Sequence, residues 1–235
     1  MDDRHPREKH EASFRSADTV ILYDPQAVDV VSPDWLQPRF WRQRNAVLGT
    51  LGGRGQALAV ATEAGPAVLR RYCRGGQAAR ISRDRYVFLG YERSRSLREW
   101  RVMRRLRELG LPVPRPLMAS CERAGVTYRA GLLTALIPDA RSLAEAGAGL
   151  TAADWRSLAD TLARLFSAGV VHADLNAHNL LRDRIGCWYV IDFDRARIQP
   201  GPADPAPMIR RLQRSMAKMG IRAGRDWLER FSTRA

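Results

Sequence analysis

The residues best suited to chemistry lie together between Val170 and Arg197. This stretch contains Asp174, then Asn179 five positions later and Asp192 eighteen positions after Asp174. A carboxylate accepts a proton from a hydroxyl group, and carboxylate and amide oxygens are hard ligands that suit Mg²⁺. Such residues serve the transfer of a phosphoryl group to a hydroxyl, a reaction that depends on positioning and charge neutralisation more than on covalent help from the protein.

The spacing of these three residues resembles the catalytic and metal-binding loops of protein-kinase-like phosphotransferases. Residues 172–179 read H-A-D-L-N-A-H-N, and an apolar run leads directly into I-D-F at Asp192. The resemblance implies that Asp174 accepts the hydroxyl proton and that Asn179 and Asp192 hold Mg²⁺. The competing interpretation is a polar turn after a helix, but this leaves the register of Asn179 and Asp192 unexplained.

A helix and a hairpin are expected to position these loops. The segment Thr151-Ala-Ala-Asp154 resembles a capping box, with aspartate in place of glutamate, and an apolar helical face follows until Gly169. Two short apolar runs on either side of residues 183–186 predict a hairpin that connects Asn179 to Asp192.

A glycine-rich turn lies between two predicted strands, Ala46–Thr50 and Gln56–Thr62. Such a turn allows backbone N–H groups to approach phosphate oxygens closely. The full G-x-G-x-x-G spacing is missing, so a plain hairpin turn is the alternative when the segment is considered by itself. The residues expected to bind the nucleotide phosphates here are Gly52, Gly53, Arg54 and Gly55.

The third predicted strand, Val68–Tyr72, places Arg70 where protein kinases carry a phosphate-binding lysine. Arginine also binds phosphate, so the departure changes the expected geometry rather than the function, and Arg71 is the alternative if the register differs by one. The predicted helix Ser94–Leu109 carries Glu99 beside its apolar face, where a carboxylate needs a partner. That partner is Arg70 in a kinase fold, or else a neighbouring surface arginine.

The chain has 39 basic and 25 acidic residues, and its net charge of +14 predicts an anionic partner. A row of arginines on the helix that carries Glu99 is either a solvated face or a docking face for an anionic membrane surface; its members are Arg98, Arg101 and Arg105. Nucleic-acid binding would rest on charge alone, so no nucleic-acid partner is expected. Three cysteines without short spacing argue against a zinc site or a disulfide framework. Neither a signal peptide nor a membrane-spanning helix is expected.

We expect an α+β, protein-kinase-like two-lobed fold with a short helical C-lobe. Residues 1–18 are predicted to be a flexible extension, residues 19–137 the N-lobe, and residues 138–235 the C-lobe. Only about 40 residues follow Asp194, which are too few for the large helical lobe of a protein kinase. A small-molecule or lipid kinase is therefore expected.

Four motifs together resemble the lipopolysaccharide-core sugar kinases, and within them the kinases of 3-deoxy-D-manno-octulosonic acid (Kdo). The motifs, within residues 45–219, are H-A-D-L-N-A-H-N (172–179), I-D-F-D-R-A-R-I (191–198), G-L-P-V-P-R-P (110–116) and G-G-R-G (52–55). The resemblance implies transfer of the ATP γ-phosphate to the 4-hydroxyl of Kdo on a lipid A precursor, with Mg²⁺, at the cytoplasmic face of a bacterial inner membrane. Asp194 stands where protein kinases have glycine, and its role is left open.

Two alternatives to this function remain at the level of sequence. A heptose kinase of the same superfamily has similar loops, and the missing third-strand lysine leaves room for a pseudokinase-type module that binds a membrane or lipid. The sequence does not determine the oligomeric state.

Overall fold

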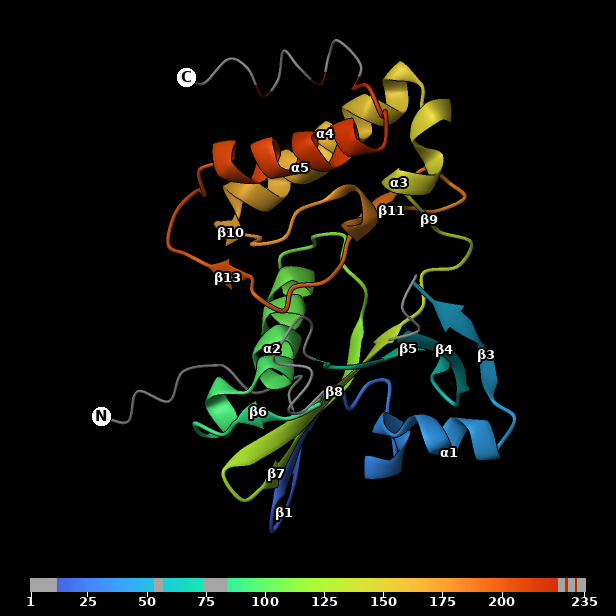
Figure 1. Cartoon of the computed structure of the whole chain (residues 1–235), viewed down its shortest axis with the longest axis vertical. Coiled ribbons are helices and arrows are strands. Elements are labelled where there is room, and N and C mark those ends of the chain that lie inside the picture. The colour runs from blue at the N-terminus through green and yellow to red at the C-terminus, as the bar shows by residue number, and fades with distance from the viewer. Residues whose placement is uncertain (1–11, 53–56, 74–83, 224–226, 228–230, 232–235) are drawn as a thin grey trace. The chain divides into compact units, whose positions relative to one another are not determined.

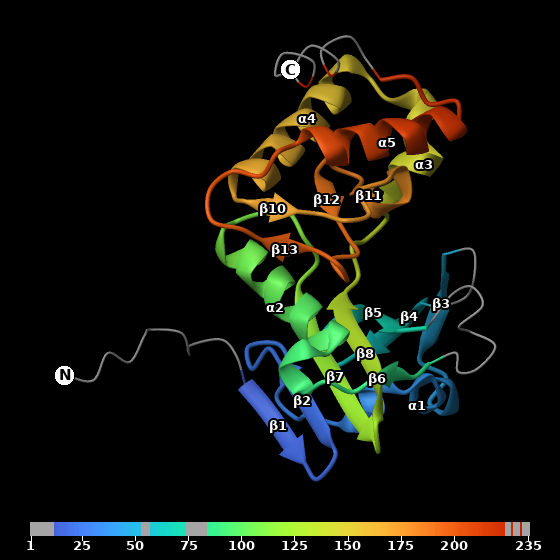
Figure 2. The ribbon, with the colours of Figure 1, turned by 60° about the vertical axis from the view of Figure 1, so that its left-hand side comes forward.

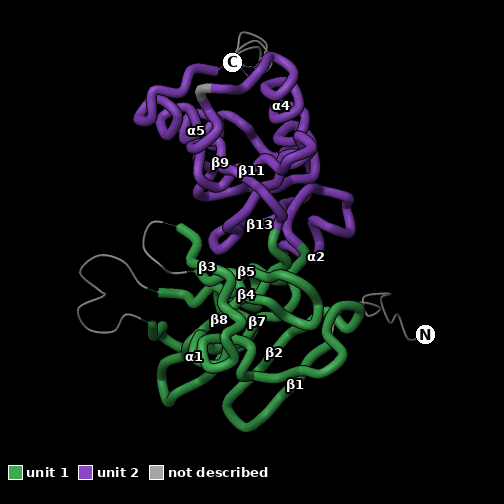
Figure 3. Tube along the Cα trace, turned by 90° about the vertical axis from the view of Figure 1, so that its right-hand side faces the viewer, with its two compact units in different colours: residues 1–100, 115–136 green, residues 101–114, 137–235 purple. Residues whose placement is uncertain are grey.

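The computed structural model describes residues 12–52, 57–73, 84–223, 227 and 231 (Figure 1). The chain divides into two compact units, shown in different colours in Figure 3. Unit 1 comprises residues 1–100 and 115–136, and unit 2 comprises residues 101–114 and 137–235.

Unit 1 is built on a large antiparallel sheet with the strand order β1-β2-β7-β8-β5-β4-β3, in which β6 also pairs with β8. The strands are β1 (Ala12–Ser16), β2 (Thr19–Tyr23), β3 (Val47–Leu51), β4 (Ala57–Thr62), β5 (Gly65–Arg71), β6 (Tyr86–Val87), β7 (Pro116–Ala124) and β8 (Thr127–Ala135). Sequential neighbours pair as hairpins, and β7 and β8 form the longest of them (Figure 2). The predicted strands around the glycine-rich turn and at residues 68–72 are confirmed as β3, β4 and β5.

Strand β1 lies inside the segment that was predicted to be a flexible extension. Residues Ala12–Ser16 pair with Tyr23–Thr19 of β2 in antiparallel register. Most side chains of β1 are exposed, so the segment lacks the apolar alternation that marks a strand in a sequence. Pairing with the buried strand β2 supplies the backbone hydrogen bonds instead.

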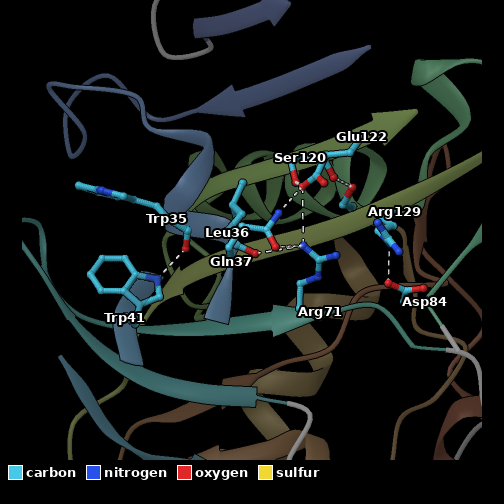
Figure 4. Close-up of polar contacts among 10 residues, drawn as sticks. Trp35, Leu36, Gln37, Trp41, Arg71, Asp84, Ser120, Glu122 and Arg129 are labelled. Carbon is cyan, nitrogen blue, oxygen red and sulfur yellow. Dashed lines mark hydrogen bonds and ion pairs between the residues drawn. The ribbon is translucent and has the colours of Figure 1, made fainter. Parts of the chain in front are cut away.

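One face of the sheet is covered by two short helices, η1 (Pro33–Leu36) and α1 (Pro38–Gln43). Trp35 and Trp41 are buried, and Trp41 Nε1 donates to the Trp35 carbonyl oxygen at 2.7 Å (Figure 4). A Cβ atom on Gly131 of β8 would lie 3.3 Å from the Leu36 Cβ atom, so η1 packs tightly on the sheet. The core of this face consists of Ile21, Val28, Trp35, Leu36, Trp41, Leu58, Val60, Ala67, Leu69, Leu117, Met118 and Leu133.

Helix α2 (Arg95–Glu108) confirms the predicted helix and follows the short helix η3 (Tyr91–Arg93). Its first turns belong to unit 1, where Ser96 Oγ donates to the Ser120 carbonyl oxygen of β7 at 2.6 Å. The remainder of α2 belongs to unit 2.

Residues 101–114 were predicted to be part of the N-lobe but cluster with unit 2. Hydrogen bonds explain this: the Val190 N–H donates to the Pro112 carbonyl oxygen at 3.0 Å, and Arg164 Nη2 donates to the Gly110 carbonyl oxygen at 2.6 Å. The exact limits of the two predicted lobes stay a prediction.

Unit 2 combines helices with two small sheets, of strand order β12-β11-β9 and β10-β13. Its strands are β9 (Arg141–Ser142), β10 (Val170–Val171), β11 (Leu180–Arg182), β12 (Trp188–Val190) and β13 (Arg197–Ile198). Its helices are α3 (Leu143–Ala146), η4 (Gly147–Gly149), α4 (Ala152–Ser167), η5 (Ala177–Asn179) and α5 (Ala206–Lys218). Near the C-terminus the structure describes Trp227 and Phe231, whose ring centroids are 4.8 Å apart.

Helix α4 begins and ends as predicted. The Thr151 hydroxyl accepts a hydrogen bond from the Asp154 N–H, and the Asp154 carboxylate accepts one from the Thr151 N–H, which completes a capping box. Gly169 has φ +78°, and a Cβ atom there would lie 2.2 Å from the Gln199 carbonyl oxygen. Glycine is therefore required where the chain turns from α4 into residues 172–179, the predicted catalytic loop.

Candidate active site

His172 stands at the start of the catalytic loop and is almost completely buried, with 1% of its surface exposed. Its Nδ1 accepts a hydrogen bond from the Asp174 N–H at 3.2 Å, and its Nε2 lies 3.1 Å from the Ile191 carbonyl oxygen. Because Nδ1 accepts, Nε2 carries the proton and donates to Ile191. Burial lowers the pKa of His172, which favours this neutral form.

Two amide side chains hold the backbone at Asp174. Nδ2 of Asn176 and Nδ2 of Asn179 donate to the Asp174 carbonyl oxygen at 3.0 and 2.9 Å. The Asn176 Oδ1 also accepts the His178 N–H at 2.9 Å, which starts the short helix η5. Because Nδ2 of Asn179 is engaged with the loop, its Oδ1 points away from that carbonyl, as a cation ligand requires.

Asp192 is brought to Asn179 by the predicted hairpin, which is confirmed. Strands β11 and β12 pair with Leu180 opposite Val190, and the Ile191 N–H donates to the Asn179 carbonyl oxygen at 3.0 Å. The loops that carry Asp174, Asn179 and Asp192 are therefore joined by direct hydrogen bonds within unit 2.

The backbone of Asp192 is in the left-handed region, with φ +64°. A residue with a Cβ atom adopts this conformation at a cost of about 1–3 kcal/mol, and such strain is concentrated at functional sites. The neighbouring ring of Phe193 is buried and packs edge-on against His172, with 5.1 Å between the ring centroids. The strained turn is thus held in place by packing and by the hydrogen bonds of the hairpin.

The hairpin is in turn anchored to the first turn of α4. Arg182 Nη2 donates to Asp154 Oδ1 at 2.5 Å, and Trp188 Nε1 donates to the Asp154 carbonyl oxygen at 3.2 Å. Burial would raise the pKa of Asp154, but hydrogen bonds from Thr151 and Arg182 outweigh it, and the pKa is lowered. Asp154 therefore stays charged and links the helix cap to the strand that precedes Asp192.

Asp174 forms an ion pair with Arg211 of α5, a residue that the sequence did not single out. Arg211 Nε and Nη2 lie 2.8 and 2.5 Å from Asp174 Oδ1. Both side chains are about half exposed, at 48% for Arg211 and 47% for Asp174, so the pair adds little to stability. The two residues are 37 positions apart in the sequence, and the only signal that points to Arg211 is the basic character of the segment that forms α5.

The oxygens of Asn179 and Asp192 suit Mg²⁺ that arrives with a nucleotide. Among the residues that the structure describes, no three or more His, Cys, Asp or Glu side chains are grouped to hold a metal ion by themselves. Mg²⁺ commonly takes one or two carboxylates and completes its shell with water and substrate phosphates. One carboxylate and one amide oxygen fit that pattern.

In unit 1, Glu99 of α2 is 1% exposed and forms an ion pair with Arg70 of β5. The Tyr72 hydroxyl donates to the same carboxylate. Burial, together with the neighbouring Glu99, raises the pKa of Tyr72 well above its usual range, so the phenol remains a donor. The predicted pairing of Glu99 with Arg70 is confirmed.

Arg71 points to the opposite face of the sheet, because side chains alternate along a strand. Its Nη1 donates to Gln37 Oε1 at 3.1 Å and lies 3.7 Å from Glu122 Oε1 (Figure 4). Gln37 also donates to Glu122 at 3.0 Å. Arg71 is thus occupied beneath η1 and α1, and Arg70 is the arginine of the pair that meets Glu99.

The predicted phosphate-binding turn is only partly described. Gly52 follows β3 and has φ +77°, a conformation that favours glycine. Gly53, Arg54 and Gly55 lie outside the described residues. The role of the turn in binding phosphate stays a prediction.

Comparison with known proteins shows the family. The sequence model of the lipopolysaccharide kinase (Kdo/WaaP) family matches residues 38–233. The chain belongs to this family. A protein named 3-deoxy-D-manno-octulosonic acid kinase from Stenotrophomonas maltophilia (strain R551-3) is 44% identical over 204 residues, which cover 85% of this chain and 80% of the relative. A protein of the same name from Xanthomonas euvesicatoria pv. vesicatoria (strain 85-10) is 43% identical over 212 residues, covering 88% and 84%.

Membership of the lipopolysaccharide kinase family confirms two predictions from the sequence. The α+β architecture is the protein-kinase-like fold, and the protein is an enzyme that transfers a phosphoryl group to an alcohol. Within the described part of the chain, none of the helices has the length and apolar character needed to cross a membrane.

The arginine row on α2 is largely accessible in this lipopolysaccharide kinase. Arg98 and Arg105 are exposed, whereas Arg101 is partly buried. Arg105 Nη1 lies 3.2 Å from Glu108 Oε2, an exposed pair whose contribution to stability is at most about 1 kcal/mol. The row therefore keeps a positive surface that an anionic partner can approach.

Proposed function

We propose that this lipopolysaccharide kinase transfers the γ-phosphoryl group of ATP to the 4-hydroxyl of Kdo on a lipid A precursor. The observation that carries the proposal is the hydrogen-bonded connection of Asp174, Asn179 and the Asp192 turn through His172 and Ile191. The names of the relatives, which match more than four fifths of this chain, support Kdo as the acceptor.

Asp174 acts as the proton acceptor in this reaction. The acceptor oxygen forms a bond to the γ-phosphorus, the bond from that phosphorus to the ADP oxygen breaks, and the hydroxyl proton passes to the Asp174 carboxylate. Asn179 and Asp192 would hold Mg²⁺, which neutralises the charge of the nucleotide phosphates when it is bound. His172 holds the two loops in register and does not exchange a proton.

The nucleotide phosphates are bound by residues of unit 1 in this proposal. Arg70 provides a guanidinium in the place of the kinase lysine, and Glu99 keeps it in position through their ion pair. The turn Gly52, Gly53, Arg54 and Gly55 supplies backbone N–H groups. Three nitrogen atoms on a planar fork suit phosphate oxygens, so an arginine here is compatible with catalysis.

The protein acts at the cytoplasmic face of the inner membrane as a peripheral protein in this proposal. Its net charge of +14 and the arginine row on α2 favour an anionic surface, and a lipid A precursor resides in such a surface. Neither nucleic acid nor a membrane-spanning segment is needed for the reaction.

Transfer of radiolabelled γ-phosphate tests the proposal. Purified protein is incubated with ATP and Mg²⁺ and given either a Kdo-bearing lipid A precursor or a heptosylated core acceptor. Label on the Kdo acceptor is expected, and mapping the phosphate to the 4-hydroxyl completes the test. Label only on the heptosylated acceptor would make the protein a heptose kinase. ATP binding without transfer to either acceptor would contradict kinase activity and favour a pseudokinase-type lipid-binding module.

A further inference from the structure

One face of α5 lies along the catalytic loop. Three side chains of α5 contact this loop, and they are spaced three and four residues apart, which places them on the same side of a helix. The contacts are the His172 N–H to Met208 Sδ at 3.2 Å, Arg211 to Asp174 at 2.5 and 2.8 Å, and the Ala177 N–H to Ser215 Oγ at 3.2 Å. Helix α5 therefore contacts the loop at His172, Asp174 and Ala177.

The geometry of the central contact leaves part of both groups available. Arg211 uses Nε and Nη2 on a single oxygen of Asp174, Oδ1, so Oδ2 and the Arg211 Nη1 take no part in the pair. Both side chains are about half exposed. Asp174, the proposed proton acceptor, is thus bound to Arg211 through one oxygen only, and the Arg211 guanidinium can still bind an anion.

The charge of α5 indicates the chemistry of a ligand. The helix has four basic residues and no acidic residue between Ala206 and Lys218, and all four are exposed. The basic residues are Arg210, Arg211, Arg214 and Lys218. The planar fork of arginine matches a carboxylate better than it matches a neutral sugar.

We propose that Arg211 binds the carboxylate of the acceptor sugar and thereby places its hydroxyl at Asp174 Oδ2. This inference rests on the proposed function, because Kdo carries a carboxylate on ring carbon 2 and the accepting hydroxyl on ring carbon 4. The Arg211 guanidinium, which is bonded to Asp174, would then bind the Kdo carboxylate while Asp174 receives the proton of the 4-hydroxyl. A neutral heptose lacks the carboxylate, so Arg211 determines acceptor specificity.

The test compares two acceptors that differ only at the carboxylate. Wild-type protein and Arg211→Gln are given the Kdo-bearing lipid A precursor and its Kdo methyl ester, and kcat and KM are measured for each. In the wild type we expect kcat/KM to fall by about 10–100-fold on esterification, because a charged hydrogen bond is lost. The Arg211→Gln variant is expected to lose this preference, mainly through a higher KM for the acid.

Two further variants sharpen the comparison. Arg210→Gln removes the neighbouring exposed arginine of the same helix and is expected to prefer the acid as the wild type does. Arg211→Lys keeps the charge without the fork and is expected to have an intermediate preference. If Arg211→Gln does not fold, as judged by thermal unfolding, the Arg211→Lys variant provides the measurement.

The possible failures are distinguishable. If Arg211→Gln prefers the acid as strongly as the wild type does, the inference is wrong while the proposed function stands. An equal loss of kcat on both acceptors with unchanged KM would mean that Arg211 acts only by positioning Asp174, which also overturns the inference. If the wild type phosphorylates neither acceptor, the proposed function fails and the inference fails with it.

Discussion

The imidazole of His172 connects Ile191, the residue before Asp192, to Asp174, the residue expected to accept the substrate proton. Its Nε2 lies 3.1 Å from the Ile191 carbonyl oxygen, and its Nδ1 accepts the Asp174 N–H at 3.2 Å. Only the neutral ring makes both bonds, because a protonated ring has no acceptor. The relative position of the two loops therefore depends on the charge of one buried histidine.

This dependence predicts a loss of stability in mild acid. Burial lowers the pKa of His172 in the folded protein, so as the pH falls below about 6.5 the unfolded chain binds the proton first. The contribution of neutral His172 to the free energy of unfolding is expected to be complete above this pH. It is expected to be lost as the pH falls from this value through the pKa of His172 in the folded protein. Urea unfolding at several pH values between about 5 and 7.5 measures the slope. For His172→Gln we expect a smaller change in the free energy of unfolding with pH. The control is His178→Gln, because His178 is an exposed histidine of the same loop. Equal pH dependence in the wild type and in His172→Gln would contradict the prediction.

Asp174→Ala removes the proposed proton acceptor. We expect kcat for phosphoryl transfer to fall by about 10²–10⁴-fold, which is the usual contribution of a general base. ATP affinity should stay close to that of the wild type, because Asp174 is not proposed to contact the nucleotide. Transfer assays and equilibrium ATP binding measure the two effects, with Glu63→Ala as the control for loss of an exposed carboxylate. A loss of activity smaller than about tenfold would remove Asp174 from this role.

Arg70→Met removes the guanidinium that forms an ion pair with the buried carboxylate of Glu99. Breaking a buried ion pair in this way is expected to lower the free energy of unfolding by about 3 kcal/mol. The double variant Arg70→Met/Glu99→Gln should recover part of this stability, because it no longer buries the Glu99 charge. Neither variant should regain wild-type ATP affinity if Arg70 binds phosphate. Arg71→Met is the matched control, since Arg71 lies on the opposite face of β5. Weaker ATP binding in Arg71→Met but not in Arg70→Met would transfer the phosphate-binding role to Arg71.

Reversing the charge of Arg98, Arg101 and Arg105 to glutamate tests the α2 face. We expect binding to vesicles that contain anionic lipid to weaken, because each basic residue near such a surface contributes about 1 kcal/mol. Co-sedimentation with the vesicles measures binding, and thermal unfolding confirms that the variant is folded. The control reverses three exposed arginines on other elements, Arg42, Arg184 and Arg222, and so has the same net charge. Equal loss of binding in both variants would mean that total charge, and not this face, attracts the protein.

Several features of the site were determined by short segments of sequence. The Thr151–Asp154 capping box, the hairpin between Asn179 and Asp192, and the helix that carries Glu99 all appear as predicted. Each depends on hydrogen bonds or apolar periodicity among residues that are close in the chain, so local physical chemistry is sufficient to predict it. Strand β1 was missed because its own side chains are mostly exposed and its partner strand decides its conformation.

The sequence by itself determined the spacing of the residues proposed for the chemistry, because Asp174, Asn179 and Asp192 lie on consecutive short elements whose spacing is encoded locally. Only the tertiary structure decided which long-range partners these three residues, and the residues proposed to bind phosphate, acquire. Side chains alternate along β5, and the first turns of α2 pack on the sheet. Arg70 therefore pairs with Glu99, and Arg71 points to Gln37 on the opposite face. The packing of α5 along the catalytic loop brings Arg211 to Asp174. These contacts join elements that are distant in sequence, and no local spacing records which side chains will meet when such elements pack.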